Sequence, residues 1–203
     1  MPDAPPSEHL MPRQALRREL RQRRRALDAG RQRQHARLVM EQLSRLPECR
    51  GARHIAAYMA CDGELDPGPY LRLARRLGSR IYLPVLAKDA PSGVRFHPLP
   101  AGPRGWRRNR YGIAEPVTRP ALPAWRLDAL LMPLVGFDRQ GHRLGMGGGY
   151  YDRLLAGLAR QSRRPRCIGL AHSCQEVAGL PVAGWDQDMD VVVTERGVIR
   201  TWR

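Results

Sequence analysis

One glycine-rich stretch carries the most distinctive chemistry of this sequence. Residues 136–152 read GFDRQGHRLGMGGGYYD, with glycine at positions 145, 147, 148 and 149. Glycine tolerates positive φ and lets backbone N–H groups approach a ligand closely, and such groups at a helix N-terminus attract anions. Arg143 adds a guanidinium that can grip a phosphate through two hydrogen bonds. Asp152 adds a carboxylate that could hold Mg²⁺ directly or through water. The stretch therefore predicts a site for a metal-bound triphosphate.

The glycine spacing by itself leaves a second interpretation open. No Gly-Lys-Ser/Thr follows, so the turn is not a Walker A loop, and Gly145–Gly149 does not form the dinucleotide-binding fingerprint. A tight strand-to-helix turn, with Tyr150 and Tyr151 as packing residues, would give the same pattern. Arg143 and Asp152 on its two sides favour phosphate binding.

The elements that must position this turn alternate between strands and helices. The apolar run 127–133 predicts a buried strand before it, and residues 150–158 predict a helix after it. Upstream, strands at 54–59 and 80–86 flank a helix at 66–77 that begins with Asp66 as N-cap. This strand–helix–strand unit indicates a parallel sheet. Further strands are predicted at 94–97, 166–171, 190–193 and 197–201.

The N-terminal part of the chain predicts two helices and a tail. Leucines at helical spacing indicate a helix over 12–27, and Asp28 can cap a second helix that ends before Pro47. Residues 1–11 are proline-rich with little to bury, which predicts a disordered tail. We therefore expect a single α/β domain over residues 12–203.

The net charge of +16 comes almost wholly from arginine, since Lys88 is the only lysine. A charge of this size favours anionic partners, either nucleic acid or small anionic substrates. The arginines are spread along the chain, apart from a cluster at 13–25, which indicates a compositional bias. That cluster predicts a mostly exposed helical face.

Cysteine usage and hydropathy indicate a soluble, cytoplasmic protein. Cys49, Cys61, Cys167 and Cys174 show no CxxC or zinc-finger spacing, so we expect ordinary thiols in a reducing compartment. No apolar run approaches the roughly 18 residues of a membrane span, and the N-terminus has no signal-peptide core. We expect a monomer that acts on small molecules, without a membrane or nucleic-acid partner.

The stretch RLGMGGGYYDRLL resembles the signature of the 5-formyltetrahydrofolate cyclo-ligase family, also called methenyltetrahydrofolate synthetases. The family pattern Arg-Leu-Gly-x-Gly-x-Gly-Tyr-Tyr-Asp is met at positions 143–152, and the strand before it, 128–143, is also similar. Four further segments resemble the family in the same order. These are 16–27, 55–66, 111–116 and 168–199.

The resemblance implies an enzyme of folate one-carbon metabolism. Such an enzyme converts 5-formyltetrahydrofolate to 5,10-methenyltetrahydrofolate, with ATP as co-substrate and Mg²⁺ as cofactor, and releases ADP and phosphate. The implied fold is a Rossmann-like, mostly parallel α/β sheet flanked by helices in a single domain (NagB/RpiA/CoA-transferase-like).

The resemblance also implies roles for individual residues. Arg143 and Tyr150 would be catalytic, Asp152 and Asp186 would bind Mg²⁺, and two sets would bind ATP and folate. The ATP set is Arg13, Arg17, Arg143, Leu144, Gly145, Met146, Gly147, Gly148, Gly149, Tyr150 and Tyr151. The folate set is Met59, Glu64, Met146, Gly147, Gly148, Gly149 and Tyr150.

Three positions depart from the family pattern. Arg13 stands where the family usually has lysine, Trp185 where many relatives carry histidine, and Gly148 where some carry lysine. The last departure leaves Arg143 with more of the phosphate charge.

Plainer interpretations of some of these residues stay open. Glu64 could be an ordinary turn carboxylate and Met59 a core residue, while Asp186 and Asp190 could form a solvated acidic turn. The charge also leaves open a nucleic-acid-binding or regulatory relative of the same fold without turnover. A ligase acting on a different folate or pterin is a third possibility.

Overall fold

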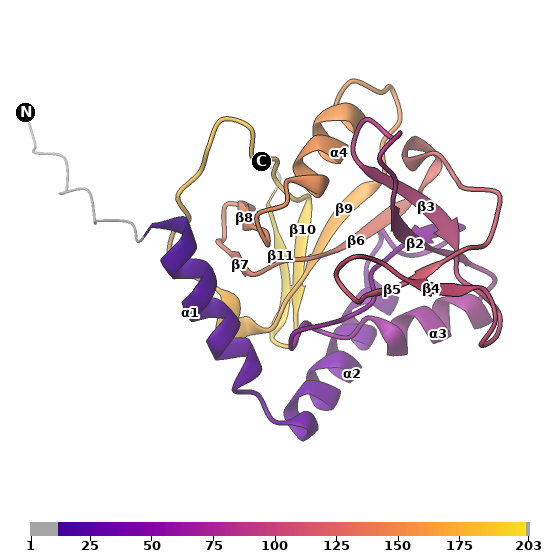
Figure 1. Ribbon diagram of the computed structural model, residues 1–203. Coiled ribbons are helices and arrows are strands. Elements are labelled where there is room, and N and C mark those ends of the chain that lie inside the picture. The colour runs from indigo at the N-terminus through magenta and orange to yellow at the C-terminus, as the bar shows by residue number, and fades with distance from the viewer. Residues whose placement is uncertain (1–11, 202–203) are drawn as a thin grey trace, which may run out of the picture.

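A seven-stranded sheet forms the centre of the computed structural model, which describes residues 12–201 (Figure 1). In spatial order its strands are β11 (Gly197–Arg200), β10 (Val191–Thr194), β9 (Arg166–Leu170), β6 (Ala129–Pro133), β1 (His54–Ala56), β2 (Arg80–Leu86) and β3 (Val94–Pro98). The inner strands from β10 to β2 are all parallel, and the two edge strands are antiparallel to their neighbours. The predicted mostly parallel α/β sheet is confirmed.

The order of the strands reverses between β1 and β6. From β1 the chain moves outward to β2 and β3, whereas from β6 it moves the other way to β9 and β10. In open α/β sheets the carboxyl ends of the strands leave a crevice at such a switch point, where ligands bind. The glycine-rich turn follows β6, so the topology brings it to this crevice.

Helices cover both faces of the sheet. On one face α2 (Ala29–Arg45) and α3 (Gly68–Arg76) pack apolar side chains on alternate residues of the strands, such as Ala129 and Leu131. On the other face α4 (Tyr150–Leu158) packs against the intervening residues, Leu130 and Met132. This alternation follows from the two-residue period of a strand. No helix in the described range is both long and apolar enough to cross a membrane.

Helix α1 (Arg13–Arg25) stands beside the sheet and not on either face (Figure 1). Its Leu16 and Leu20 form a separate small core with Val135, Leu144 and Leu180. The helix is therefore docked on the segments that follow β6 and β9, next to the glycine-rich turn.

Most predicted elements are present with small shifts at their ends. Strand β2 and helix α4 have the predicted bounds, and Asp28 caps α2 by accepting a hydrogen bond from the Arg31 N–H at 2.9 Å. Strand β1 ends at Ala56, three residues earlier than predicted. Helix α3 begins at Gly68, two residues later than predicted, and Pro67 takes the N-cap position that was predicted for Asp66. The carboxylate of Asp66 accepts the Gly68 N–H at 2.8 Å. The predicted tail, residues 1–11, lies outside the described residues.

Two short hairpins were not predicted. They are β4 (Trp106–Arg108) with β5 (Ala114–Pro116), and β7 (Gly136–Phe137) with β8 (Arg143–Leu144). Strands of two or three residues leave no usable period in a sequence. The described chain also contains two single-turn 3₁₀ helices, η1 (Ala124–Arg126) and η2 (Ser173–Gln175).

Two charged residues that the sequence placed on the surface are buried. Arg24, on the arginine-rich face of α1, is 0% exposed and donates to the carbonyl of Asp62 at 2.9 Å, to its carboxylate at 2.8 Å and to the carbonyl of Leu134 at 3.2 Å. Asp190 is 8% exposed and accepts hydrogen bonds from Arg164 and from the Cys167 N–H at 2.7 Å. Arg24 is thus the one buried arginine of the mostly exposed face expected at 13–25, and the alternative of a solvated turn does not hold at Asp190. Each partner lies more than twenty residues away, so local sequence could not reveal it.

Candidate functional site

The glycine-rich turn lies at the carboxyl end of β6, between the β7–β8 hairpin and α4. Gly147 has φ +98° and Gly149, the N-cap of α4, has φ +65°, conformations that side chains with a Cβ rarely adopt. The backbone N–H groups of residues 146–150 donate to no other described residue. Unpaired amides at a helix N-terminus form a ready site for an anion. The turn predicted from sequence therefore presents the groups that phosphate binding needs.

Arg143 and Asp152 hold the two ends of this turn together. The Arg143 side chain is 2% exposed and pairs with Oδ1 of Asp152, while its Nε has no partner in the described structure. Its guanidinium lies 5.8 Å from the centre of the Tyr151 ring. The other carboxylate oxygen of Asp152 makes no hydrogen bond to a described residue. The pair therefore leaves donors of Arg143 and one oxygen of Asp152 without a hydrogen-bond partner among the described residues.

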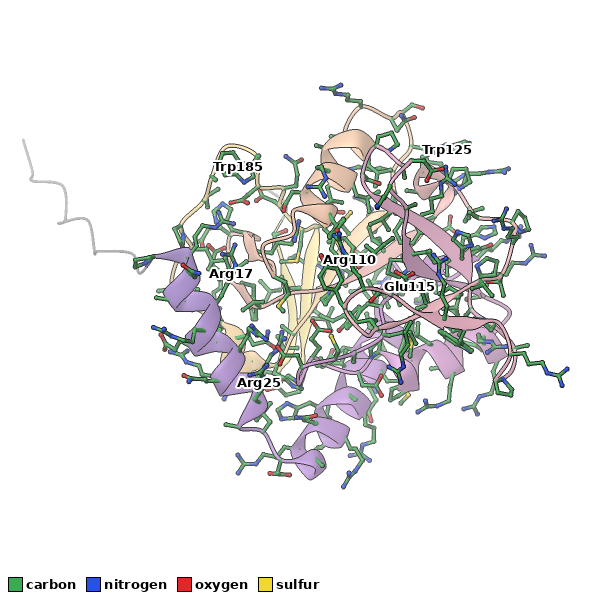
Figure 2. The ribbon with its side chains drawn as sticks, in the orientation of Figure 1. Arg17, Arg25, Arg110, Glu115, Trp125 and Trp185 are labelled. Atoms are coloured by element: carbon green, nitrogen blue, oxygen red, sulfur yellow. The ribbon has the colours of Figure 1, made fainter. Side chains whose placement is uncertain are left out.

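Helix α1 brings a second arginine onto the turn. The Nε of Arg17 donates to the carbonyl of Gly145 at 2.8 Å, and a Cβ at Gly147 would lie 3.7 Å from the Arg17 guanidinium carbon. Figure 2 shows Arg17 on the side of α1 that faces the hairpin. This placement depends on Gly136, since any Cβ there would overlap Leu20 of α1. The structure thus joins two segments that are 128 residues apart, as the resemblance implied.

Arg13 and Asp186 form an ion pair beside this turn. The guanidinium of Arg13 donates to both oxygens of Asp186, to Oδ1 at 3.0 Å, and to the carbonyl of Pro181 at 3.1 Å. Asp186 also accepts the Ala183 N–H at 2.8 Å. Burial acts to raise the pKa of Asp186, but these hydrogen bonds lower it below its ordinary value. An expected phosphate ligand and an expected metal ligand therefore neutralise each other in this structure.

Tyr150 lies among groups that the sequence did not single out. The guanidinium of Arg110 donates to its hydroxyl, and that of Arg153 lies 5.0 Å from its ring centre. Gly93 and Gly148 sit so close that a Cβ at either would come within 3.0 Å of the ring. The position of Arg110 next to the segment YGIAEP was the signal that could have identified it. Figure 2 shows Arg110 near the middle of the molecule, between α4 and the β4–β5 hairpin.

Three expected folate contacts lie near the carboxyl ends of β1 and β6. Met59 is 40% exposed and Met146 is 54% exposed, so the interpretation of Met59 as a core residue was wrong. The side chain of Glu64 is 7% exposed, accepts the Cys61 N–H at 3.2 Å and lies 3.8 Å from Arg24. Burial raises the pKa of Glu64. A nearly buried carboxylate and two exposed methionines on the segments after these strands fit a flat ligand with polar edges.

The described residues thus define a class of protein. It is an α/β protein in which unpaired amides, arginines and carboxylates lie together at the switch point of the sheet. A family model, the 5-formyltetrahydrofolate cyclo-ligase family, matches residues 10–195. The chain belongs to this family, and the predicted membership is confirmed.

Curated relatives agree over most of their length. The chain is 40% identical over 180 residues to the 5-formyltetrahydrofolate cyclo-ligase of Escherichia coli K12, covering 86% of this chain and 96% of that one. It is 38% identical to the Haemophilus influenzae protein of the same name, covering 89% and 97%. The NMR structure of Aquifex aeolicus 5,10-methenyltetrahydrofolate synthetase superposes with a TM-score of 0.80 at 29% identity, covering 94% and 93%. The fold and the order of the motifs are therefore shared along the whole domain.

Proposed function

We propose that this chain converts 5-formyltetrahydrofolate to 5,10-methenyltetrahydrofolate, using ATP and Mg²⁺. One observation carries the proposal: the unpaired amides of residues 146–150 open at the switch point between Arg17, Arg143 and Asp152. Family membership supports the substrate class, and the unpaired amides beside the exposed Met146 support binding of a triphosphate there.

The reaction needs an activated formyl group, because the oxygen of a formamide is a poor leaving group. The formyl oxygen attacks the γ-phosphorus of ATP, the bond from phosphorus to the bridging oxygen breaks, and ADP leaves. N10 then attacks the formyl carbon, the carbon–oxygen bond breaks, phosphate leaves, and N10 loses its proton. Nothing is oxidised or reduced. The protein is needed mainly to position the reactants and to neutralise charge.

Arginine and backbone groups would hold the phosphates. Arg143 is nearly buried and fixed by Asp152, so its remaining donors are oriented before the nucleotide arrives. Arg17 lies across Gly147 and would cover the same phosphates from α1. Fixed donors aimed at the transferring group lower the barrier without reorganising during the reaction.

The carboxylates of the site fit Mg²⁺ unequally. Mg²⁺ prefers oxygen donors, is commonly held by one or two carboxylates plus substrate phosphates, and would neutralise the phosphate charge. Asp152 has one oxygen without a hydrogen bond to any described group, so it can act as a ligand without rearrangement. Both oxygens of Asp186 are occupied by Arg13. We therefore assign Asp152 as the principal ligand, and expect Asp186 to join only when Arg13 moves onto a phosphate.

The folate would lie along the exposed methionines. Met59 and Met146 offer apolar surface, Glu64 offers a carboxylate for the polar edge of the pterin, and Tyr150 offers an aromatic ring. Arg110, bound to the Tyr150 hydroxyl, is placed to approach the same ligand. Tyr150 thus connects the folate region with the nucleotide turn.

The direct test follows the absorbance of methenyltetrahydrofolate with and without ATP. Activity that requires ATP supports the proposal. Asp152→Asn should reduce turnover about 10- to 100-fold, with partial recovery when Mn²⁺ replaces Mg²⁺. Asp89→Asn is the matched control, because Asp89 is 70% exposed and pairs only with Arg95 among the described residues. Unchanged turnover of Asp152→Asn at ordinary Mg²⁺ would remove the metal assignment.

The net charge keeps a second function in consideration, a nucleic-acid-binding relative without turnover. RNA binding that weakens steeply with salt, together with no ATP-dependent absorbance change, would favour it. The unpaired turn beside Arg143 and Asp152 favours the enzyme. We place the reaction in the cytoplasm and expect a monomer of 23.0 kDa, which light scattering can check.

A further inference from the structure

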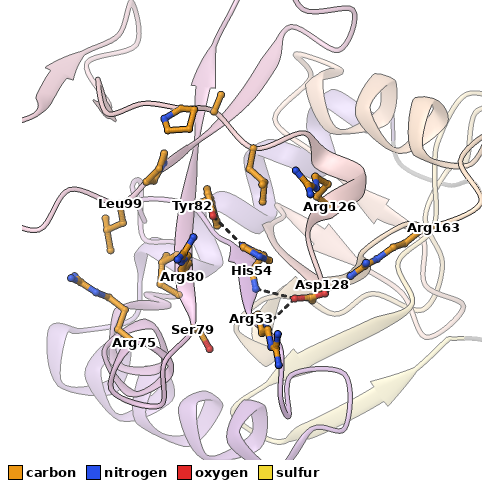
Figure 3. A pocket seen from close by; sticks show the side chains of 15 residues that line it. Arg53, His54, Arg75, Ser79, Arg80, Tyr82, Leu99, Arg126, Asp128 and Arg163 are labelled. Carbon is orange, nitrogen blue, oxygen red and sulfur yellow. Dashed lines mark hydrogen bonds and ion pairs between the residues drawn. The ribbon is translucent and has the colours of Figure 1, made fainter.

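A cleft opens at the end of the sheet opposite the glycine-rich turn. It lies at the amino ends of β1, β2 and β6, whereas the glycine-rich turn follows the carboxyl end of β6. Its volume is about 820 Å³. Figure 3 shows arginines placed around His54 and Asp128. These arginines are Arg53, Arg75, Arg80, Arg126 and Arg163.

The residues that line this cleft carry more positive than negative charge. Asp128 is the carboxylate in its lining, and it accepts the N–H groups of Arg53 and His54, both at 2.9 Å, and the guanidinium of Arg163 at 2.7 Å. The side chains of the other four arginines make no ion pair with any described residue. Elsewhere arginines meet carboxylates, as Arg164 meets Asp190. Like charges gathered without partners repel one another, so an anion entering the cleft would relieve that repulsion.

The floor of the cleft is polar and its wall is apolar. The Nδ1 of His54 lies 3.0 Å from the hydroxyl of Tyr82, which leaves Nε2 of the ring for a ligand. Ile81, Leu99 and Leu122 line the wall. Tyr82 is 5% exposed, so it offers no face on which a nucleic-acid base could stack. The volume falls in the range of small-molecule sites.

We propose that this cleft is a second anion-binding site, which takes a small molecule carrying several phosphate groups. A guanidinium group can bind two phosphate oxygens at once through two parallel hydrogen bonds. Four guanidinium groups without carboxylate partners therefore suit a ligand that carries several negative charges better than a ligand with one carboxylate. The site is separate from the proposed nucleotide turn, because the two lie at opposite ends of parallel strands. Its ligand therefore does not compete with ATP for the same groups.

The test titrates the full chain with inorganic tripolyphosphate in a calorimeter. We expect two independent sites in the unaltered protein, one at the glycine-rich turn and one in the cleft. Arg75→Gln, Arg80→Gln and Arg126→Gln together should weaken the cleft site by about tenfold or more and leave the first site in place. The control variant removes the same three charges from exposed positions of α2, with Arg33→Gln, Arg37→Gln and Arg45→Gln. It should keep both sites.

Two results would overturn the proposal. Equal weakening in both triple variants would mean attraction by the overall charge and no site. Single-stranded RNA that binds more tightly than tripolyphosphate, and loses affinity only in the cleft variant, would make the cleft a nucleic-acid surface. The cleft variant should retain the ATP-dependent absorbance change of the unaltered protein. Absence of that change in the unaltered protein would refute the proposed function and leave the binding result intact.

Discussion

Replacing Gly147 with alanine separates the binding role of the glycine-rich turn from its backbone strain. Gly147 has φ +98°, and Gly78, just after α3, has φ +93° with nothing within 4 Å of the Cβ that alanine would add. Alanine in this region costs roughly 1–2 kcal/mol at either position. Gly78→Ala is therefore a control with the same strain and no site. At Gly147 an added Cβ meets Arg17 only at ordinary contact distance, 3.7 Å, so steric overlap adds little.

The two variants should differ in nucleotide binding. Relieving the strain at residue 147 turns its peptide groups, so the amides of the turn no longer converge on a phosphate. Hydrogen bonds to a charged group contribute about 1.5–3 kcal/mol each, so the loss of one corresponds to roughly a 10- to 150-fold weaker affinity. We expect KM for ATP to rise by this factor in Gly147→Ala and to stay within about twofold in Gly78→Ala. Urea unfolding should show a similar loss of stability for both.

A Gly147→Ala variant with unchanged KM for ATP and the same stability loss as the control would refute the reasoning. The turn would then have only a structural role, and its backbone N–H groups would not bind the nucleotide. A much larger stability loss than in the control would mean that Gly147 is needed for folding. In that case direct measurement of ATP binding by the folded fraction decides the question.

The remaining predictions concern stability and the folate region. Although burial acts to raise it, hydrogen bonds from Arg21, Arg25 and Arg24 lower the pKa of Asp62 to about 2. The ionised Asp62 carboxylate therefore stabilises the folded protein by about 2 kcal/mol above its ordinary pKa of 3.8, and this stabilisation should be lost as pH falls from about 4 to 2. In Asp62→Asn the urea midpoint should therefore change less over this pH range. Gly136→Ala should destabilise the protein by about 1–3 kcal/mol, because its Cβ overlaps Leu20 and displaces α1; urea unfolding measures this. Burial raises the pKa of Glu64, so its charged form costs stability above that pKa. Glu64→Gln should therefore be as stable as the unaltered protein at pH 7 or more so, while KM for the folate rises in the absorbance assay.

The sheet was predictable because its strands are buried and because turn residues and polar loops in the sequence mark where each strand begins and ends. The run at 80–86 stands between Gly78–Ser79 and a polar loop, and strand β2 has these bounds. Strand β1 was predicted too long, because Ala57 makes the last ladder hydrogen bond, to Tyr82 at 3.0 Å, and the chain then turns away. Hydrophobicity continues through Tyr58 and Met59, yet Tyr58 lies in an irregular segment after the strand and is buried, with its hydroxyl donating to the Leu65 carbonyl at 2.6 Å. Hydropathy cannot distinguish a buried irregular segment from a buried strand.

Candidate site residues that are close in sequence could be predicted to lie together. Contacts between residues that are far apart in sequence could not. Arg143, the glycines and Asp152 lie within ten positions, so their proximity could be predicted from the sequence, although the glycine spacing alone left a packing turn open. Arg110 reaches Tyr150 across 40 positions, and although it directly precedes the YGIAEP segment, nothing in the sequence pairs it with Tyr150. The pairing of Arg13 with Asp186 spans 173 positions. The resemblance assigned both residues to the site, but it gave them to different ligands and could not show that they hold each other.

This mutual pairing explains how so basic a site can exist before its substrate arrives. Arg13, Arg17 and Arg143 converge on one turn, where three unbalanced charges would repel one another. Asp186 and Asp152 neutralise two of them, and Arg17 instead uses a backbone carbonyl. A triphosphate with its metal brings both signs of charge at once. Each arginine can then leave its carboxylate and pair with a phosphate. The carboxylate that is set free can bind the metal. On the proposed function, the ion pairs of the free site therefore stand in for the contacts of the occupied one.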